Sequence, residues 1–317
     1  MNARIAIFAA VVALGLAAPF LGLYPVLVMK LLCFALFACA FNLLIGFVGL
    51  LSFGHAMFFG SAAYAAGYSM KVWGFTPELG LLFGVAVAAL LGLVTGALAI
   101  RRQGIYFAMI TMALAQMVYF IALQAPFTGG EDGLQGIPRG SLLGVLPLQN
   151  DLTLYYVIFA IVVAAWLFIA RIVHSPFGQI LKAIRENEPR TISLGYDTDR
   201  FKLIAFVLSA ALAGLAGSLK ALVLGFATLS DVYWGTSGSV ILMSLIGGIG
   251  TLTGPVIGAF VITGLENMLA DRVGSWVTVV LGVIFVVSVL VFRQGLVGTF
   301  NRFLPGPSRR LRESPAE

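Results

Sequence analysis

One short stretch, Ser175 to Lys202, is unusually rich in charged side chains for this chain. This stretch carries five basic and four acidic side chains, although only 10% of the whole chain is charged. Pro176 is placed to open a helix, Pro189 to interrupt it, and Gly195 to cap a second, shorter helix. A helix, a break and a short helix form a shape suited to docking onto another protein. An ordinary solvated loop is the alternative interpretation.

Residues that commonly carry catalysis or bind metal are few and poorly spaced for either purpose. His55 and His174 are the only histidines, and the HExxH pattern of a zinc hydrolase is absent. No serine or cysteine stands out as a nucleophile beside a histidine and an acid. Cys33 and Cys39 point to different faces of an expected helix, which favours packing over a disulfide. We therefore expect no catalytic residue and no metal site.

The phosphate-binding residues of an ATPase are also missing from the sequence. A P-loop needs GxxxxGK[ST], whose backbone amides and lysine hold the phosphates. No Gly-Lys pair occurs, and the Gly-rich stretch 247–254 lies in an apolar segment. The chain is therefore expected to hold no cofactor of its own, and any ATP would be bound by a separate subunit.

The composition indicates that most of the chain lies in lipid. Hydrophobic residues make up 60% of the sequence and the mean hydropathy is +1.03, whereas soluble domains carry roughly 25% charged residues. Continuous apolar runs predict spanning helices rather than the alternating strands of a membrane barrel. The net charge of +6 is interpreted as the excess of Lys and Arg in cytoplasmic loops, and not as a nucleic-acid surface.

About ten apolar segments are candidates to cross a bilayer, which takes about 20 helical residues. The longer ones are 5–23, 26–45, 79–100, 105–123, 152–170, 203–224 and 275–292, and the shorter, Gly-interrupted ones are 53–70, 238–249 and 255–270. Threading ten spans from a cytoplasmic N-terminus places fourteen Lys and Arg residues inside and three outside. This predicts an all-α polytopic membrane protein with both termini in the cytoplasm. A cleaved signal peptide at 5–23 is the alternative to a retained first helix, which is favoured.

Five spans on either side of a long outer loop predict two halves of opposite orientation, as in inverted-repeat transporters. Each half contains a short Gly-rich segment, interpreted as an element beside a transport path, with glycine-mediated helix packing as the alternative. The predicted parts are a first half at 1–123, an extracytoplasmic loop at 124–151, a second half at 152–293 that includes the loop 175–202, and a flexible cytoplasmic tail at 294–317.

Polar or glycine positions in apolar surroundings are candidates to line a path through the membrane. They are Asn42, Ser52, His55, Thr111, Gln116, Gly247, Gly248 and Gly250. Hydrogen bonding between helices explains the polar ones equally well, and His55 in particular is expected to be a hydrogen-bonded packing residue.

Two further groups of residues lie toward the expected outer surface. Candidates for docking a binding protein or for gating are Gly129, Gly130, Glu131 and Asp132, with a turn-rich connector as the alternative. Lys30 and Lys220 lie near span ends, where they are expected to snorkel, and Glu266 is expected to be interfacial. No acid falls at the predicted midplane, which argues against an ion-coupled carrier.

Four blocks of sequence resemble one family of transport proteins. They are GLLSFGHAMFFGSAAYAAGY (49–68), QGIYFAMITMALAQMVYF with TGGEDGLQGIP (103–120 and 128–138), AIRENEPRTISLGYDTDRFKLIAFVLSAALAGLAGSL (183–219) and GGIGTLTGPVIGAF (247–260). Together they are similar to the permeases of ATP-binding cassette importers of the branched-chain amino acid type, the LivM family.

The resemblance implies the membrane subunit of an importer, with no enzymatic activity of its own. Its partners would be a sister permease, two cytoplasmic ATPases that bind ATP and Mg²⁺, and an extracytoplasmic substrate-binding protein. Transport would proceed by alternating access on branched-chain amino acids, with urea, short amides or aromatic acids as alternatives. The loop 175–202 would be the ATPase contact, and the residues assigned to coupling are Arg185, Glu186, Asn187, Glu188, Ser193, Leu194 and Gly195.

Overall fold

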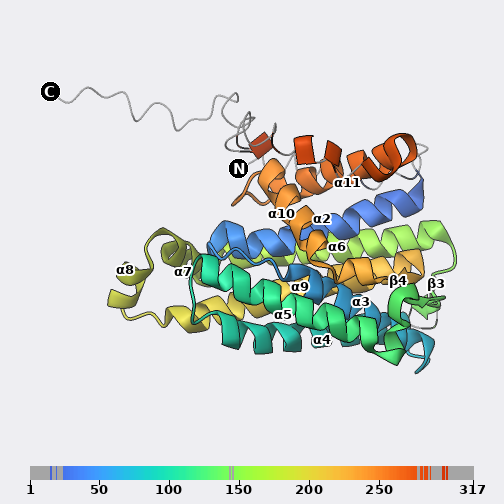
Figure 1. The fold of residues 1–317 in the computed structure, drawn as a ribbon, viewed down its shortest axis with the longest axis horizontal. Coiled ribbons are helices and arrows are strands. Elements are labelled where there is room, and N and C mark those ends of the chain that lie inside the picture. The colour runs from blue at the N-terminus through green and yellow to red at the C-terminus, as the bar shows by residue number, and fades with distance from the viewer. Residues whose placement is uncertain are drawn as a thin grey trace.

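A computed structural model (Figure 1) describes residues 24–276 apart from 143 and 145, together with Gly15, Pro19 and a few isolated positions from 279 to 298. The predicted spans at 5–23 and 275–292, and the predicted tail at 294–317, therefore lie largely outside the described residues.

The other eight predicted segments are helices. They are α2 (Pro25–Phe47), α3 (His55–Lys71), α4 (Pro77–Ala99), α5 (Ile105–Gln124), α6 (Asp151–His174), α9 (Thr198–Leu224), α10 (Trp234–Gly247) and α11 (Gly254–Val273). Proline stands in the first turn of α2, α4 and α11, where its missing N–H costs no hydrogen bond. Five of these helices, α2, α4, α5, α6 and α9, are long and apolar enough to cross a membrane. The helices support the all-α membrane class, while the total of ten and the inverted relation of the halves remain predictions.

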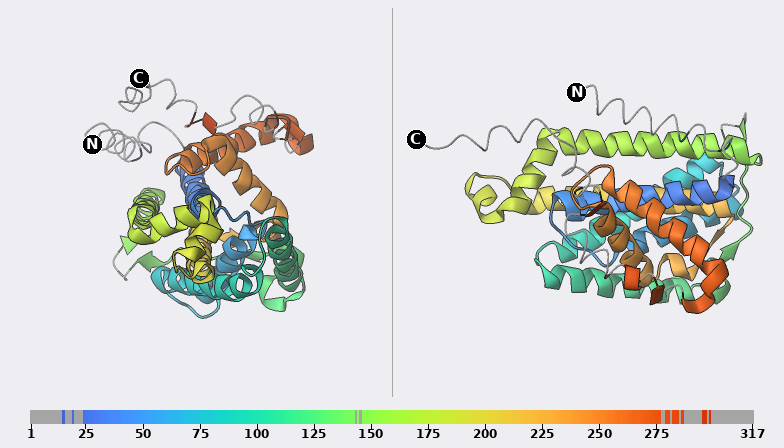
Figure 2. Two further views of the ribbon diagram at one scale, coloured as in Figure 1. Left: turned by 90° about the vertical axis from the view of Figure 1, so that its left-hand side faces the viewer. Right: turned by 90° about the horizontal axis from the view of Figure 1, so that it is seen from above.

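The connections form two distinct ends of an elongated bundle (Figures 1 and 2). At one end, here called the loop end, α7 (Pro176–Glu186) and α8 (Glu188–Ser193) project from the bundle. The opposite end, here called the strand end, holds short strands and 3-10 turns. These are η2 (Pro126–Thr128), η3 (Gly130–Asp132), β1 (Leu134–Gln135), β2 (Ser141–Leu142), β3 (Leu146–Pro147), β4 (Phe226–Ala227) and η4 (Leu229–Asp231), while η5 (Gly274–Trp276) follows α11. β1 pairs with β4 and β2 with β3, both antiparallel.

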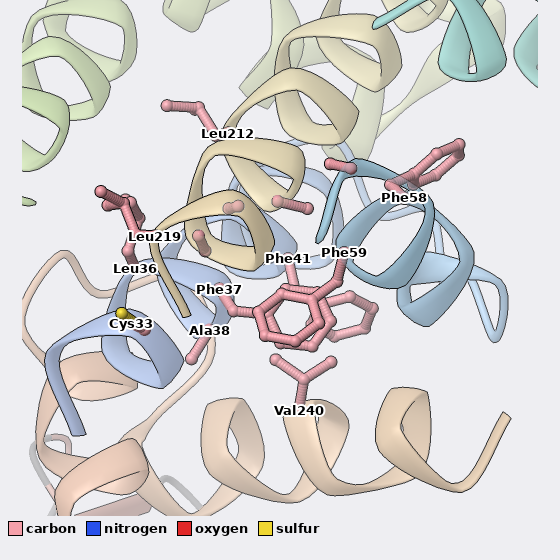
Figure 3. Packing of buried hydrophobic residues seen from close by; sticks show 14 of the residues in the cluster. Cys33, Leu36, Phe37, Ala38, Phe41, Phe58, Phe59, Leu212, Leu219 and Val240 are labelled. Carbon is pink, nitrogen blue, oxygen red and sulfur yellow. The ribbon is translucent and has the colours of Figure 1, made fainter. Parts of the chain in front are cut away.

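Two helices form the centre of the bundle. The apolar windows of α2 and α9 are 83% and 72% buried, whereas those of α4, α5 and α6 are 33%, 28% and 33% buried. Figure 3 shows where α2, α3 and α10 meet: Phe37 and Phe59 lie with ring centroids 4.6 Å apart, and Val240 points toward them. The outer three helices are therefore the ones that can face lipid or another subunit.

Glycines allow α9 to approach α3 and α4 closely. A Cβ atom on Gly217 would lie 1.9 Å from the Phe59 carbonyl oxygen, and one on Gly214 would lie 2.3 Å from Cβ of Ala88. Small residues at helix contacts replace the hydrophobic driving force that lipid removes, because they bring backbones into van der Waals contact. The glycine content noted in the sequence is thus used for packing as well as for breaks.

α3 and α10 are too short to cross the membrane alone. Their 17 and 14 residues correspond to roughly 25 Å and 21 Å of helix, against about 30 Å of hydrocarbon. α3 begins at His55, whose ring contacts Ser209 halfway along α9. The non-helical residues 48–54 that precede α3 therefore lie inside the bundle and not at its end.

Replacing Gly217 with alanine is expected to lower the free energy of unfolding by about 1–3 kcal/mol, the usual cost of overpacking a core. Because the added methyl group would collide with the Phe59 carbonyl, α3 and α9 must separate. Thermal unfolding in detergent, followed by labelling of the buried thiols of Cys33 and Cys39, measures the effect. Gly238→Ala is the control, because its methyl group meets no atom of another element within 4 Å. Equal melting temperatures would contradict the close α3–α9 contact.

Candidate functional site

The loop 175–202 has the helix, break and short helix that its sequence predicts. Ser175 opens α7 by accepting a hydrogen bond from Gly178 N at 3.3 Å, and Asn187 opens α8 by accepting one from Arg190 N at 3.0 Å. α8 ends at Ser193, and Gly195, two residues later, has φ +89° and donates its N–H to the Ile192 carbonyl at 2.9 Å. Asn187 and Gly195, two residues assigned to coupling, are therefore the caps that shape α8.

Glu188 points inward and holds α8 against the bundle. Its Oε1 accepts hydrogen bonds from Lys202 Nζ and from Thr198 Oγ1, the latter at 3.2 Å, and its Oε2 accepts one from Gln103 Nε2 at 3.0 Å. Lys202 is only 2% exposed, so its charge depends on this partner. Glu188 therefore joins α8 to both α9 and the α4–α5 connection, and Gln103 and Lys202 were not foreseen from the sequence.

Arg185 joins α7 to the end of α2. Its Nη1 donates to the Gly46 carbonyl, one of the last carbonyls of α2, and a cation is favourable at a helix C-terminus. The side-chain stem lies against Gly49, where a Cβ atom would be 3.1 Å from Arg185 Cγ. Lys182 Nζ lies 5.9 Å from the centre of the Phe47 ring. α7 is thus fixed to α2 through backbone as well as side-chain contacts.

The remaining residues assigned to coupling face outward. Glu186, Ser193 and Leu194 are exposed, and Ser193 Oγ donates to the Arg190 carbonyl at 2.8 Å. Leu194 is the most exposed of three apolar side chains on this surface, here called the apolar tip. The apolar tip consists of Ile192 (54% exposed), Leu194 (69%) and Tyr196 (43%).

Asn42 connects the two halves of the chain across a break in the second. Its Oδ1 accepts from Gly250 N at 3.0 Å and its Nδ2 donates to the Thr251 carbonyl at 2.8 Å. These residues belong to the non-helical stretch 248–253 between α10 and α11, here called the Gly loop. Trp166 Nε1 donates to the Leu252 carbonyl at 3.1 Å. The structure therefore brings the path candidates Asn42 and Gly250 together.

Gly247 and Gly248, the other two glycines among the path candidates, allow the chain to turn from α10 into the Gly loop. A Cβ atom on Gly247 would lie 1.9 Å from the Gly254 carbonyl oxygen, and Gly248 has φ +118°. Gly250 is also left-handed, with φ +78°. Glycine is required at these positions because other residues are strained at positive φ or would clash.

Most of the polar path candidates satisfy buried backbone or side-chain groups. His55 Nε2 lies 2.8 Å from Ser209 Oγ, and Ser209 donates to the Ala40 carbonyl at 2.5 Å. Ser52 Oγ accepts from Gly54 N at 3.2 Å, and Thr111 Oγ1 donates to the Ala108 carbonyl at 2.9 Å. These contacts support the packing interpretation of the three polar residues. Gln116 Oε1 is buried and has no hydrogen-bond partner among the described residues, and the same holds for the second ring nitrogen of His55, Nδ1.

Ser237 of α10 was not predicted to matter and satisfies the start of α3. Its Oγ accepts from Ala56 N at 2.8 Å, which replaces the local N-cap that α3 lacks. Ser237 directly precedes the predicted segment 238–249. This position was the only signal in the sequence for its contact with α3.

An apolar groove of about 470 Å³ lies between the break before α3 and the first half of α5. None of its described lining residues is charged, so it can hold an apolar group without desolvating a charge. Its apolar residues do not stand out in an apolar sequence, so the groove was not predicted. Its lining consists of Gly49, Leu50, Leu51, Phe53, Gly104, Ile105, Phe107, Ala108, Met109, Met112 and Trp234.

The outward faces of α4 and α5 differ in composition. The large exposed side chains of α4 are aliphatic: Leu79, Leu82, Leu90, Leu93, Val94 and Leu98. Those of α5 include methionine and aromatic residues: Ile105, Tyr106, Met109, Met117, Phe120 and Ile121. Methionine and aromatic residues are enriched at protein interfaces, so the α5 face differs from a purely lipid-facing one.

The outer-loop candidates lie on a connection that is fixed to the bundle. Gly129 precedes η3 and Gly130 begins it, both with positive φ, while Glu131 and Asp132 are exposed. Lys71 Nζ donates to the Gln135 carbonyl at 2.7 Å. The connection is therefore an ordered structure that presents two acids at the strand end.

The prediction that Lys220 snorkels to the surface is wrong. Lys220 Nζ pairs with Asp231 Oδ1 at 2.5 Å, and both side chains are 7% exposed. Asp231 Oδ2 also accepts from Thr228 N at 3.1 Å. The chain folds back after α9 and brings an acid to the lysine, which linear spacing did not reveal. Within the described residues, no cluster of His, Cys, Asp and Glu could hold a metal ion.

Comparisons with known proteins agree with the sequence resemblance at the level of the family. The family model described as "Branched-chain amino acid transport system / permease component" matches residues 26–289. The LivM permease proteins of Escherichia coli (strain K12) and Salmonella typhimurium are each 28% identical over 81% of this chain and 65% of their own length. The autoinducer 2 import permease LsrC of Enterobacter sp. (strain 638) is also 28% identical, over 78% of this chain and 74% of its own length.

The chain spans 65% of the length of the LivM proteins that it matches. No solved structure matches it. Similar identity to LivM and LsrC leaves the substrate of this chain open.

Glu188→Gln is expected to lower the free energy of unfolding by about 3–5 kcal/mol, because it leaves the buried Lys202 without a counter-charge. Asp197→Asn is the control. Asp197 pairs with Arg200 on an exposed surface, so its loss should cost roughly 1 kcal/mol or less. Thermal unfolding in detergent measures both variants. A Glu188→Met/Lys202→Met double variant should recover much of the loss, and equal effects of Glu188→Gln and Asp197→Asn would contradict the buried pair.

Proposed function

The chain belongs to the family of branched-chain amino acid transport system permease components, and we propose that it is the membrane-spanning subunit of an ATP-driven importer. The apolar tip carries this proposal. Ile192, Leu194 and Tyr196 are exposed at the end of a loop whose other side is held by buried contacts. Clustered exposed apolar side chains mark interaction sites.

The partner at the apolar tip is a cytoplasmic ATPase, which binds ATP and Mg²⁺. This places the loop end in the cytoplasm of a bacterial inner membrane, with both termini on that side. The sequence supports this orientation through its excess of Lys and Arg in the predicted cytoplasmic loops. Glu131 and Asp132, exposed at the strand end, then face the binding protein that delivers substrate.

A second permease, a sister subunit or another copy, covers the outward face of α5. Methionine and aromatic side chains on this face suit a protein partner, whereas the aliphatic face of α4 suits lipid. The groove opens along α5 and would become part of the path between the two permeases. Gln116, with its buried oxygen lacking a partner among the described residues, belongs to the same helix.

The substrate is a hydrophobic amino acid of the branched-chain class. The groove offers an apolar lining without charged side chains, which suits an aliphatic side chain better than a urea or a short amide. A permease for a polar, autoinducer 2-like compound is the second candidate, since LsrC proteins match at similar identity. In either case alternating access would move the substrate, with energy supplied by the ATPases.

Leu194→Asp is expected to reduce the ATPase recovered with the tagged chain by about tenfold or more, because a charge replaces an apolar contact residue. The tagged chain is expressed in its own host, solubilised gently, and its partners are quantified by mass spectrometry. Ala183→Asp, at an exposed position of α7, is the control and should leave recovery unchanged. Equal ATPase recovery with Leu194→Asp and the wild type would show that the apolar tip is not the contact.

Uptake of leucine by the reconstituted complex is expected to fall by about tenfold in Met112→Gln, since an amide in the groove must lose water without gaining a partner. Met112→Leu keeps the apolar lining and should transport normally. Unlabelled isoleucine and valine should compete with leucine, and autoinducer 2 should not. Competition by autoinducer 2 alone would favour the LsrC-like alternative.

A further inference from the structure

We propose that the loop 175–202 controls the width of the groove by holding its two walls separately, through Arg185 on one wall and Gln103 on the other. This inference rests on the proposed function, which supplies the force, and adds how that force reaches the path. It assigns positioning roles to both residues.

The first wall is the break before α3. Gly49, Leu50, Leu51 and Phe53 line the groove there, and this stretch follows closely on the end of α2. Arg185 donates to the Gly46 carbonyl and packs its stem on Gly49. Any displacement of α7 is therefore passed to the residues that begin this wall.

The second wall is the start of α5. Gly104, Ile105, Met109 and Met112 line the groove there. Gln103 precedes them and donates to Glu188 Oε2 at 3.0 Å, and Glu188 is the first residue of α8. α8 is therefore attached to the second wall, while α7 is attached to the first.

The two attachments lie on opposite sides of the break in the loop. Asn187 has an extended backbone between α7 and α8, with φ −158° and ψ 95°. A change of angle at Asn187 would move Arg185 relative to Glu188, and hence one wall relative to the other. Hinges of this kind need only one or two residues that absorb the backbone change.

The Gly loop also connects Arg185 to α10, which contributes Trp234 to a third side of the groove. A Cβ atom on Gly250 would lie 3.2 Å from Arg185 Nη1, and Gly250 N donates to Asn42. The Gly loop follows α10, whose other end carries Trp234 of the groove lining and Ser237, the cap of α3. Movement of Arg185 would therefore also reach the groove through α10.

The test uses the complete complex with its ATPases and binding protein, reconstituted in liposomes. Gln103→Leu and Arg185→Gln are each expected to lower substrate uptake per ATP hydrolysed by about tenfold, the effect of losing one hydrogen bond to a charged group. ATPase recovery should stay at the wild-type level in both. Arg185→Lys, which keeps one donor for the Gly46 carbonyl, should restore part of the coupling.

Arg101→Gln is the matched control, because it removes an exposed charge beside Gln103 outside this contact chain. Gln103 is exposed, so Gln103→Leu should fold even if Arg185→Gln does not. Wild-type uptake per ATP in Gln103→Leu would overturn the two-wall inference while leaving the importer intact. Failure of the wild-type chain to recover any ATPase would overturn the proposed function and the inference with it.

Discussion

The arrangement of this protein depends on one constraint: a backbone break inside lipid must have its polar groups satisfied by protein. The described residues contain two such breaks, at residues 48–54 and in the Gly loop. Asn42 forms hydrogen bonds with two backbone groups of the Gly loop, and Ser237 and Ser52 accept hydrogen bonds from N–H groups at the start of α3. Asn42 and Ser237 come from helices in the other half of the chain, whereas Ser52 lies within the break itself. The breaks can therefore exist only where α2, α3 and α10 meet, and this fixes the position of the groove beside them.

Close packing supplies the rigidity that such breaks remove. α9 approaches α3 so closely at Gly217 that no side chain fits, and α2 is almost entirely enclosed. Of the less buried helices, α4 packs closely on α9, as at Gly214 and Ala88, whereas α5 and α6 have 28% and 33% of their apolar windows buried. A closely packed centre of α2, α3, α4 and α9 with α5 and α6 outside it is suited to relative movement between an inner and an outer layer. The groove lies at the boundary between these layers, where α5 meets the break before α3.

Local signals in the sequence predicted local structure well. Pro176 and Gly195 bound α7 and α8 as their chemistry requires, and the apolar runs mark the described helices to within a few residues. Partners across the fold were not predictable, because they depend on which helices become neighbours. Nothing near Glu188 or Lys220 indicates a buried ion pair with Lys202 or Asp231. The groove was missed for another reason: apolar residues that line a cavity look the same in sequence as those that face lipid.

The hydrogen bond between Ser237 and Ala56 has a consequence for how the protein is made. The two residues are 181 positions apart, so most of the chain must leave the ribosome before the start of α3 gains its cap. During that interval α3, which is short and less apolar than its neighbours, has an exposed amide at membrane depth. The N–H of Ala56 is paired by protein only after α10 has been synthesised and packed against α3, so the final packing of α3 follows the synthesis of α10. The order of synthesis and the order of membrane assembly therefore differ in this protein.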